Sequence, residues 1–308
     1  MNRLQQKFKH IATLINVGLF FIVTILVIKV NSLYTKFEIK VDRFNEFKRN
    51  YIEQYVALFN ESGANVAVYF KDISTNYTIE IEPEKKIPSA SLIKIPIMAA
   101  VYYLADKGEL SLDEEIVYKK KHRCGGSGII KNCRYGEKFT IRKLLELMIT
   151  ISDNVATHMI IDKVGLKRFN EIFKNMGLKN TNLDRYVMDL NARNKGIENY
   201  ITVEDIGKLL ERIYYGKLVS KEASMEMLKI MMEQKIDDRI RKKLPKDVIV
   251  ANKTGLMKDV CHDAGIVFTN KGDFILCVLT ENLDHKVAKN FIADLAYKAY
   301  SLYSSLSN

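Results

Sequence analysis

Residues 88–98 read PSASLIKIPIM and place Ser91 and Lys94 in an S-x-x-K arrangement at the start of a predicted helix. Residues three apart on a helix share a face, so the Lys94 amine can reach the Ser91 hydroxyl. A neutral amine can take the proton of a serine, and a helix N-terminus favours developing negative charge. About one S-x-x-K is expected by chance in a Lys-rich chain of this length. The motif therefore indicates a nucleophilic serine only if other residues support it.

The second candidate motif is Ser152-Asp153-Asn154, which lies between the helical patterns of residues 141–151 and 155–164. Ser, Asp and Asn are the residues that cap helices, so capping alone explains this motif equally well. In the functional interpretation, the loop projects Ser152 and Asn154 into a cleft. There, Ser152 relays a proton and Asn154 holds a substrate amide.

The third candidate motif is Lys253-Thr254-Gly255, which follows the strand-like residues 248–251. A glycine lets a substrate backbone approach a strand closely. Lys253 and Thr254 offer a positive charge and a hydroxyl group to a substrate carboxylate.

Around these motifs, the spacing of apolar residues predicts the order of the elements. Steps of three and four predict an amphipathic helix over residues 34–60 that ends at Ser62-Gly63. Alternation predicts strands at residues 65–70, 77–81, 248–251, 264–268 and 274–279. Helices are predicted at residues 97–104, 141–151, 155–164, 166–176, 203–214, 221–232 and 285–303. Strands from both ends can then form one antiparallel sheet flanked by the terminal helices, with the central helices as a separate lobe.

Together and in this order, the three motifs form the trio found in class A β-lactamases and penicillin-binding proteins. Ser152 follows Ser91 by 61 residues, and Lys253 follows Ser152 by 101 residues. Residues 45–303 resemble the class A serine β-lactamase family, and the segments ELMITISDNVATHMII (146–161) and TNLDRYVMDLN (181–191) are similar to their counterparts there. The resemblance implies an α+β fold, with an α/β part formed by residues 45–93 and 246–308 and an all-helical lobe formed by residues 94–245.

The resemblance implies a role for each catalytic residue. Ser91 would be the acylated nucleophile, Lys94 its proton acceptor, and Ser152 the relay to the leaving nitrogen. We expect burial and the nearby Lys253 to depress the pKa of Lys94.

The resemblance also implies the contacts with substrate. Asn154 would bind an acylamide, and the Lys253-Thr254-Gly255 strand would bind the carboxylate through Lys253 and Thr254. The backbone N–H groups of Ser91 and Leu256 would form the oxyanion hole. No cofactor and no metal is expected, because the five histidines form no H-E-x-x-H or H-x-H-x-D pattern.

One position departs from the family pattern. Class A enzymes carry a Glu in the loop sequence E-x-x-L-N, which activates the water that releases the acyl group. Here Leu190 and Asn191 fit the end of this pattern, and Val187 stands where the Glu belongs. Asp189 and Asn191 are the candidates for holding that water if the loop is reshaped. Losing a general base slows the step that it serves about 10²–10⁴-fold. We therefore expect acylation to survive, whereas release of the acyl group is in doubt.

Three functions fit these motifs. The first is a serine hydrolase of β-lactamase type that is acylated by β-lactams. The second is a penicillin-binding-protein-like peptidase acting on D-Ala-D-Ala peptides of peptidoglycan, which the missing Glu favours. The third is a non-catalytic sensor of wall fragments or antibiotic, against which the intact motifs argue, because a pure binder has no need of Lys94. The protein is expected to act as a monomer.

The N-terminal segment predicts a membrane location. Residues 11–28 read IATLINVGLFFIVTILVI, carry no charge, and follow a basic segment with Arg3, Lys7 and Lys9. A run of roughly 18 apolar residues can span a bilayer, and a basic flank stays in the cytoplasm. We therefore predict a cytoplasmic tail (1–10), a transmembrane anchor (11–30) and an extracellular hydrolase domain (31–308). A secreted protein left by signal cleavage is the alternative, although residues 29–34 fit a cleavage site only loosely.

The composition and charge exclude several classes of protein and partner. A chain of 308 residues with 47% hydrophobic and 28% charged residues is not a disordered protein. Its net charge of +11 favours anionic surroundings. Outside the cell, nucleic acid is not an expected partner, and the sequence contains no nucleic-acid motif. The absence of Trp excludes a Trp-dependent carbohydrate platform.

The remaining candidate residues are cysteines and histidines. Four Cys are too few for a disulfide scaffold. Cys124 and Cys133 flank a glycine-rich loop and either pair or remain thiols, whereas Cys261 and Cys277 fit core positions. His262 and Asp263 either border the site or begin a strand, and His158 is expected to pack or to lie on the surface.

Overall fold

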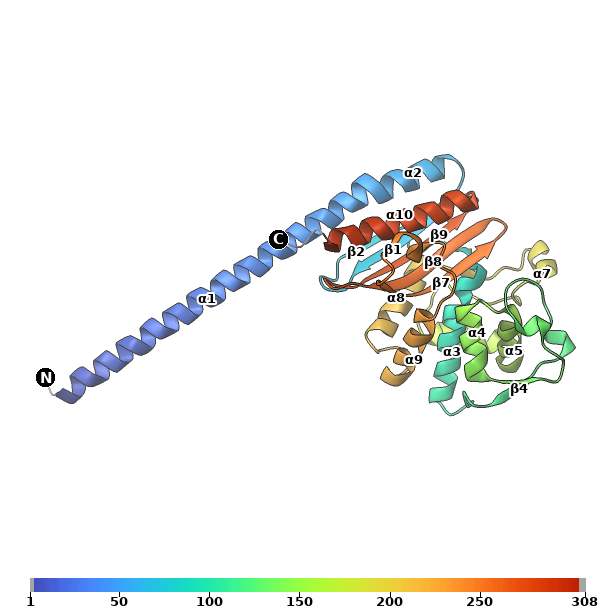
Figure 1. Ribbon diagram of the computed structural model, residues 1–308, viewed down its shortest axis with the longest axis horizontal. Coiled ribbons are helices and arrows are strands. Elements are labelled where there is room, and N and C mark those ends of the chain that lie inside the picture. Colours follow the sequence, from blue (N-terminus) through green and yellow to red (C-terminus); the bar gives the residue numbers. More distant parts are fainter. Residues whose placement is uncertain (1–2, 305–308) are drawn as a thin grey trace. The chain divides into compact units, whose positions relative to one another are not determined.

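The computed structural model of this chain describes residues 3–304 and divides into two compact units, one ending at Phe47 and one beginning at Lys48. The first unit is a single helix, α1 (Arg3–Phe47), drawn in blue in Figure 1. Large apolar side chains such as Leu19, Phe20 and Ile28 are exposed along it. The helix is long and apolar enough to be a candidate membrane span, a test that a signal sequence also passes. The predicted boundaries at residues 10 and 30 stay predictions.

The second unit opens with a π-helical turn (Lys48–Glu53) followed by α2 (Gln54–Glu61). The helix predicted over residues 34–60 is thus divided among α1, this turn and α2, because a π turn accommodates an extra residue. The predicted end is confirmed: Ser62 caps α2, and Gly63 adopts a φ of 83°, which glycine accommodates without strain.

Five antiparallel strands form the central sheet, in the order β2-β1-β9-β8-β7. The strands are β1 (Asn65–Asp72), β2 (Thr78–Ile81), β7 (Ile249–Met257), β8 (Val260–Phe268) and β9 (Phe274–Glu281). The first strand pairs with the last along its full length, with Val68 opposite Val278. The two ends of the compact unit therefore meet in one sheet, as predicted.

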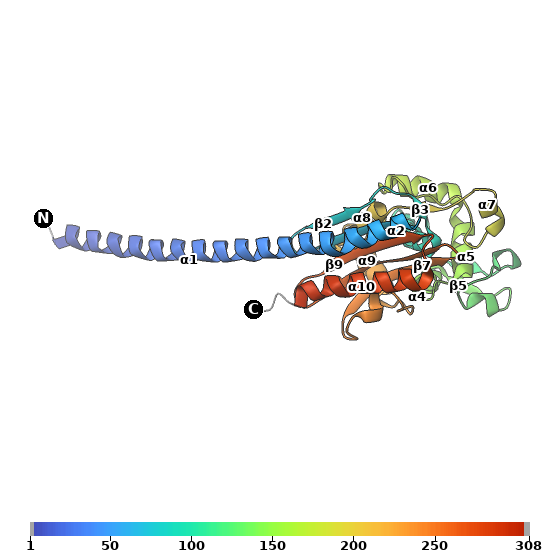
Figure 2. The ribbon, with the colours of Figure 1, turned by 90° about the horizontal axis from the view of Figure 1, so that it is seen from above.

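Helices cover both faces of this sheet. On one face, α2 and α10 (His285–Ser304) lie side by side, where Phe291 contacts Phe59 with ring centroids 5.1 Å apart (Figures 1 and 2). On the other face, α8 (Val203–Tyr214) packs against β1, β8 and β9. Gly207 permits this packing, because an added Cβ would lie 2.5 Å from the Tyr69 ring.

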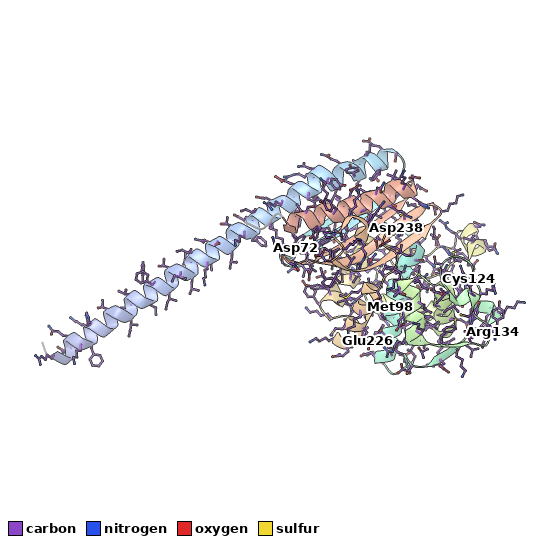
Figure 3. The ribbon with its side chains drawn as sticks, in the orientation of Figure 1. Asp72, Met98, Cys124, Arg134, Glu226 and Asp238 are labelled. Carbon is purple, nitrogen blue, oxygen red and sulfur yellow. The ribbon has the colours of Figure 1, made fainter. Side chains whose placement is uncertain are left out.

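The helical lobe lies beyond α8 and is built around α3 (Lys94–Asp106), whose residues from Lys94 to Val101 are all buried. Its other helices are α4 (Ile141–Thr150), α5 (Asn154–Val164), α6 (Leu166–Asn175), α7 (Leu190–Asn194) and α9 (Lys221–Met232). The side chains of Thr140, Asp153, Thr202 and Ser220 cap the N-termini of α4, α5, α8 and α9. In Figure 3, Met98 marks the centre of the lobe.

In the lobe and at its border with the sheet lie short strand pairs that the sequence pattern did not predict. They are the pairs β3 (Ile87–Pro88) with β6 (Tyr200–Ile201) and β4 (Glu115–Val117) with β5 (Lys138–Thr140). Short 3₁₀ helices complete the unit at Ala90–Ile93, Lys120–His122, Ile130–Asn132 and Ile240–Lys243. Strands of two or three residues are too short to show an alternating pattern. The lobe predicted to be all-helical therefore also contains short strands.

Candidate active site

The segment before α3 holds Ser91 in a tight turn. Ser91 lies in the 3₁₀ helix Ala90–Ile93, and Ala90 adopts a φ of 43°, which is uncommon for a residue with a Cβ. The N–H of Ser89 donates to the carbonyl of Asn199 at 2.8 Å. On the sheet side, a Cβ added at Gly255 would lie 3.3 Å from the Cβ of Ala90. The sheet and the lobe thus hold this turn between them.

Lys94 is the first residue of α3 and is fully buried. Its amine donates to the Ser152 carbonyl at 2.9 Å, to Ser152 Oγ at 3.1 Å and to Asn154 Oδ1 at 2.8 Å. Burial lowers the pKa of Lys94 to about 7, against the opposing effect of the Asp153 carboxylate. A substantial fraction of the amine is therefore neutral near pH 7 and able to accept a proton.

The Ser152-Asp153-Asn154 segment both caps a helix and reaches into the site. Asp153 caps α5 by accepting from the N–H of Ala156 at 2.9 Å. Ser152 adopts a φ of 57°, and both Ser152 and Asn154 contact the Lys94 amine. Capping is therefore confirmed for Asp153, whereas the proton relay through Ser152 and the binding of a substrate amide by Asn154 stay predictions.

Lys253 brings a second amine to the same hydroxyl group. It lies inside β7, is fully buried, and donates to Ser152 Oγ at 3.1 Å and to the Thr254 carbonyl at 2.7 Å. Burial, and next the charge of Lys94, lower its pKa well below the usual value. A hydroxyl oxygen can accept from two amines while donating its own proton. Ser152 is thus placed to pass protons between Lys94, Lys253 and a third group.

A cavity of about 370 Å³ opens beside these groups. Its size suits a small ligand. One wall is apolar, since Val187, Leu190 and Leu256 all border it. The full set of lining residues is Ala90, Ser91, Gly126, Ser127, Asn154, Arg185, Val187, Met188, Leu190, Arg193, Asn199, Leu256, Met257 and Lys258.

The residues proposed for deacylation are divided between two places. Val187 is buried and borders the cavity. Within residues 3–304, the walls of this cavity do not include Asp189 or Asn191. The Asp189 carboxylate caps α7 by accepting from the N–H of Ala192 at 2.9 Å, and Asp189 borders a neighbouring pocket together with His158. The role of Asp189 and Asn191 in activating water stays a prediction.

The loop that carries Val187 is closed by ion pairs that the sequence analysis missed, and one of these pairs is buried. Arg185 pairs with Glu198 at 2.6 Å, and Arg193 joins the same Glu198 to Asp259 of the β7–β8 turn, with both contacts at 2.7 Å. The side chain of Asn199 donates to the Arg185 carbonyl at 3.0 Å. Charged residues at both ends of the loop were the available signal, but their pairing requires the folded chain.

A glycine-rich loop packs directly on the second motif, and its role was also missed. A Cβ added at Gly126 would lie 2.5 Å from Asn154 Nδ2, and one at Gly128 would lie 2.3 Å from Cγ of Asp153. The backbone N–H groups of Ile129 and Ile130 donate to Asp153 Oδ2 at 2.7 and 3.0 Å. The sequence GGSG was the signal, because adjacent glycines mark positions where two chain segments approach closely.

The other candidate residues lie in or near the core. Cys124, which Figure 3 labels, and Cys133 are partly buried free thiols, whereas Cys261 and Cys277 are fully buried, as predicted. His158 packs edge-on against Tyr186 with ring centroids 5.1 Å apart.

His262 and Asp263 lie in the middle of β8 and are fully buried, so neither begins a strand. Burial lowers the pKa of His262 to about 4 and raises that of Asp263 to about 6.

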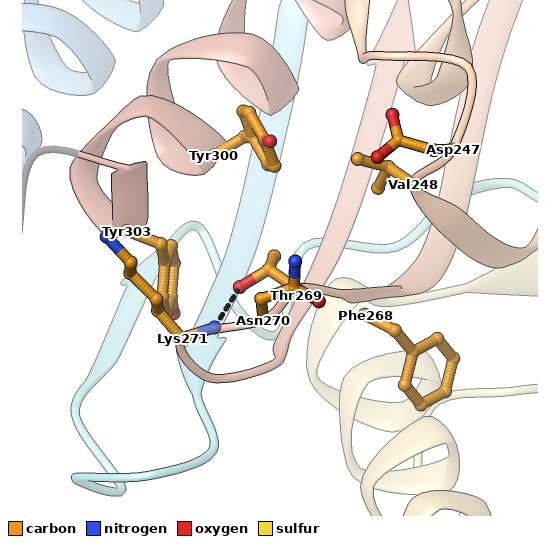
Figure 4. Close-up of a pocket in the computed structure, with 8 residues that line it drawn as sticks. All are labelled: Asp247, Val248, Phe268, Thr269, Asn270, Lys271, Tyr300 and Tyr303. Atoms are coloured by element: carbon orange, nitrogen blue, oxygen red, sulfur yellow. Dashed lines mark hydrogen bonds between the residues drawn. The ribbon is translucent and has the colours of Figure 1, made fainter. Parts of the chain in front are cut away.

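A second cavity of about 210 Å³ lies at the beginning of β7, beside the β8–β9 turn and the end of α10 (Figure 4). Its lining residues include Asp247, Asn270, Lys271 and Tyr300. None of the residues of the three motifs borders it. The three motifs therefore lie away from this second cavity.

Known proteins share this fold. A family model described as "Beta-lactamase enzyme family" matches residues 50–303. Beta-lactamase 3 of Bacillus cereus is 28% identical over 242 residues, which cover 77% of this chain and 75% of that protein. A β-lactamase of Streptomyces lavendulae is 27% identical over 244 residues, covering 74% of this chain and 78% of its own.

Solved structures agree. A β-lactamase from Sphaerobacter thermophilus superimposes with a TM-score of 0.76 at 28% identity, over 82% of this chain and 97% of that chain. A leucine-to-glutamate mutant of PBP-A, solved as an acyl-enzyme complex with penicillin G, gives a TM-score of 0.75 at 25% identity, over 82% of this chain and 96% of its own.

The fold is therefore that of the class A β-lactamases, and the relatives indicate a hydrolase of the β-lactamase type. The chain belongs to the β-lactamase enzyme family. The resemblance inferred from the three motifs is confirmed.

Proposed function

We propose that this protein is a serine acyl-transferring hydrolase that reacts with β-lactams at Ser91 and releases the acyl group slowly. The observation that carries the proposal is the meeting of the Lys94 and Lys253 amines at Ser152 Oγ, each at 3.1 Å, beside the cavity that Ser91 borders. The S-x-x-K spacing places the Lys94 amine within reach of Ser91, and a buried neutral amine there would convert the Ser91 hydroxyl into a nucleophile.

In the acylation step, Ser91 Oγ attacks the lactam carbonyl carbon while its proton passes to Lys94 Nζ. Ser91 and Leu256 both border the cavity, and their backbone N–H groups would stabilise the charge on the carbonyl oxygen. The C–N bond of the lactam then breaks, and its nitrogen takes a proton from Ser152, which recovers one from Lys94. The product is an ester on Ser91.

Three side chains orient the substrate in this proposal. Asn154 donates to the acylamide carbonyl from the cavity wall. Lys253 and Thr254 hold the carboxylate at the β7 edge. Lys253 is unlike an ordinary surface lysine, because its pKa is lowered and an incoming carboxylate would favour its protonated form.

The release step is where this chain differs from a fast β-lactamase. A valine at position 187 cannot take a proton from water, and Asp189 is engaged in capping α7. The absence of a general base slows hydrolysis of the ester about 10²–10⁴-fold. The Ser91 ester is therefore expected to be long-lived.

A second function is favoured by the same valine. Penicillin-binding peptidases share the three motifs and lack the deacylating Glu, so a D-Ala-D-Ala-type peptide of peptidoglycan is the alternative substrate. In both functions the domain faces the cell wall from a membrane anchor formed by the apolar part of α1.

The deciding experiment mixes the full chain, purified in detergent, with penicillin G and follows its intact mass over time, with Ser91→Ala as the control. A lasting adduct that Ser91→Ala lacks supports acylation with slow release. Consumption of penicillin without a lasting adduct indicates fast turnover and assigns the release step to another group. If the chain forms no adduct and consumes no penicillin, β-lactams are excluded as substrates.

A further inference from the structure

His262 is fully buried in the middle of β8, and each of its ring nitrogens has a backbone partner. Nδ1 accepts from the N–H of Thr280 at 3.1 Å, and Nε2 donates to the carbonyl of Pro88 at 2.8 Å. A backbone N–H can only donate and a carbonyl can only accept. The two contacts therefore select the neutral imidazole with its proton on Nε2.

The contact with Thr280 occurs where the β8–β9 ladder is interrupted. The register pairs Val260 with Glu281 and resumes at Asp263 with Val278. Between these pairs, the Thr280 hydroxyl donates to the Cys261 carbonyl at 2.7 Å, and its N–H is satisfied by the imidazole. Buried N–H groups need such partners, so this half of the His262 contacts stabilises the sheet.

The contact with Pro88 joins His262 to the segment that carries Ser91. Pro88 belongs to β3, three residues before Ser91, and pairs with Tyr200 of the lobe. The following turn contains Ala90 with its positive φ, and the His262 ring also lies against Gly255, where an added Cβ would be 3.2 Å from His262 Cδ2. The imidazole of β8 thus contacts three elements: β9 at Thr280, β7 at Gly255 and the segment that carries Ser91.

We propose that His262 is a positioning residue for acylation, which fixes the Pro88–Ser91 segment against β7 so that the N–H groups of Ser91 and Leu256 face one oxygen atom. This inference rests on the proposed function. A displacement of about 1 Å within such a pair of donors is sufficient to slow the reaction about 10²-fold. Burial keeps the imidazole neutral across the working pH range, and protonation would place a second donor against the Thr280 N–H.

Two substitutions separate the two contacts. In His262→Gln, the amide nitrogen replaces Nε2 and keeps the donor to Pro88, but the acceptor for Thr280 is lost. In His262→Asn, the shorter side chain keeps an acceptor for Thr280 and loses the donor to Pro88. An orphaned buried N–H destabilises a protein more often than an under-satisfied carbonyl does.

In the full chain, the two variants are therefore expected to rank in opposite orders for stability and for the acylation rate. Thermal stability falls further in His262→Gln, whereas the rate constant for acylation by penicillin G falls further in His262→Asn, by about 10- to 10²-fold. A purely structural role requires the rate to follow stability, with His262→Gln the slower variant, and that result would overturn the proposal.

Two measurements do not depend on acylation. Nitrogen NMR of the imidazole should show the neutral Nε2–H form from pH 5 to 8; a proton on Nδ1 there would contradict the proposal. Hydrogen exchange at the amides of residues 89–93 should accelerate in His262→Asn and not in His262→Gln. If the wild-type chain forms no penicillin adduct, the proposed function fails, and the exchange result alone decides the role of His262.

Discussion

At the residue scale, we expect position 187 to control how long the proposed ester survives. Val187 borders the cavity beside Ser91 and offers water no proton acceptor. A glutamate there would supply the missing base, so Val187→Glu is expected to shorten the lifetime of the penicillin adduct about 10²–10⁴-fold. The decay of the adduct is followed by intact mass.

The matched control for this substitution is Val187→Gln, because a glutamine side chain has nearly the same shape as glutamate and cannot take a proton. Equal lifetimes in the Glu and Gln variants would show that loop distortion, and not base catalysis, accelerates release.

We expect Lys94 to give the acylation rate its pH dependence. Burial lowers the pKa of this amine to about 7, and only the neutral form accepts the Ser91 proton. The acylation rate constant should therefore rise with pH through about 7 and then level off, with roughly 10²-fold slower acylation at pH 5. Stopped reactions between pH 5 and 9 test this profile.

Lys94→Arg keeps a cation that does not deprotonate, so its acylation should be lost at every pH. The exposed Lys143→Arg is the control and should behave as wild type. A wild-type profile without an inflection between pH 6 and 8 would assign the proton transfer to another group.

Some of these residues were accessible from the sequence, and others were not. The motifs that bring Lys94, Ser152 and Lys253 together could be found in the sequence because each has fixed internal spacing, and the roles of these residues and of Ser91 stay predictions. The Arg185–Glu198 pair could not be predicted, because its two charges meet only once the loop between them has folded. The contact of His262 with Pro88 could not, because it joins residues 174 positions apart.

At the element scale, the glycine-rich loop supports the second motif through close approach. Gly128 of this loop has a φ of 115°, and Gly136, which lies eight residues further along the chain, has a φ of 96°. Alanine is strained at both positions, but only at Gly128 does its Cβ meet the Asp153 carboxylate, 2.3 Å from Cγ, whereas the space at Gly136 is open. Gly128→Ala should therefore lower the free energy of unfolding by about 1–3 kcal/mol more than Gly136→Ala does.

Urea denaturation measures this difference, and the acylation rate should fall only in Gly128→Ala. If the two variants lose equal stability, the loop moves freely and does not support Asp153.

The loop of residues 185–198 depends on its buried ion pair. Arg185 and Glu198 are both nearly inaccessible, with side chains 4% and 6% exposed. Removing one partner of such a pair leaves a buried charge and destabilises a protein by about 3–5 kcal/mol. Glu198→Gln should show this loss in urea denaturation.

Glu233→Gln is its control, because Glu233 pairs with Lys235 at the surface, with side chains 69% and 63% exposed. A surface pair contributes about 0–1 kcal/mol. Similar losses in both variants would mean that the loop is held by its backbone contacts and not by the ion pair.

Long elements were predictable because their periods are repeated several times. The helix of residues 221–232 and the final helix from residue 285 have the predicted starts. The strand carrying Lys253 extends to Met257 and not merely to Ala251, since its polar residues are buried in the site and interrupt the apolar pattern. Buried polar residues therefore make the second half of this strand unrecognisable from the pattern of apolar residues.

At the scale of the whole molecule, the proposed location of the hydrolase domain depends on the apolar segment of α1. Leu19, Phe20 and Ile28 are exposed on an uncharged stretch long enough to cross a bilayer. Such residues favour insertion by roughly 0.3–0.6 kcal/mol each at the helix centre, whereas an arginine there opposes it by about 2.5–3.5 kcal/mol. We therefore expect the full chain to resist carbonate extraction from membranes and to be digested by protease added outside intact cells.

A double variant that combines Phe20→Arg and Phe21→Arg, two adjacent central residues, should release a large fraction of the chain from the membrane. Phe8→Arg, which lies before the uncharged stretch, should leave it bound. The intact mass of the membrane-bound chain discriminates between the two possible fates of α1. A mass that includes the apolar segment supports the anchor, because the bilayer then retains the helix. A shorter chain in the medium would instead identify the segment as a cleaved signal and the hydrolase as a secreted protein.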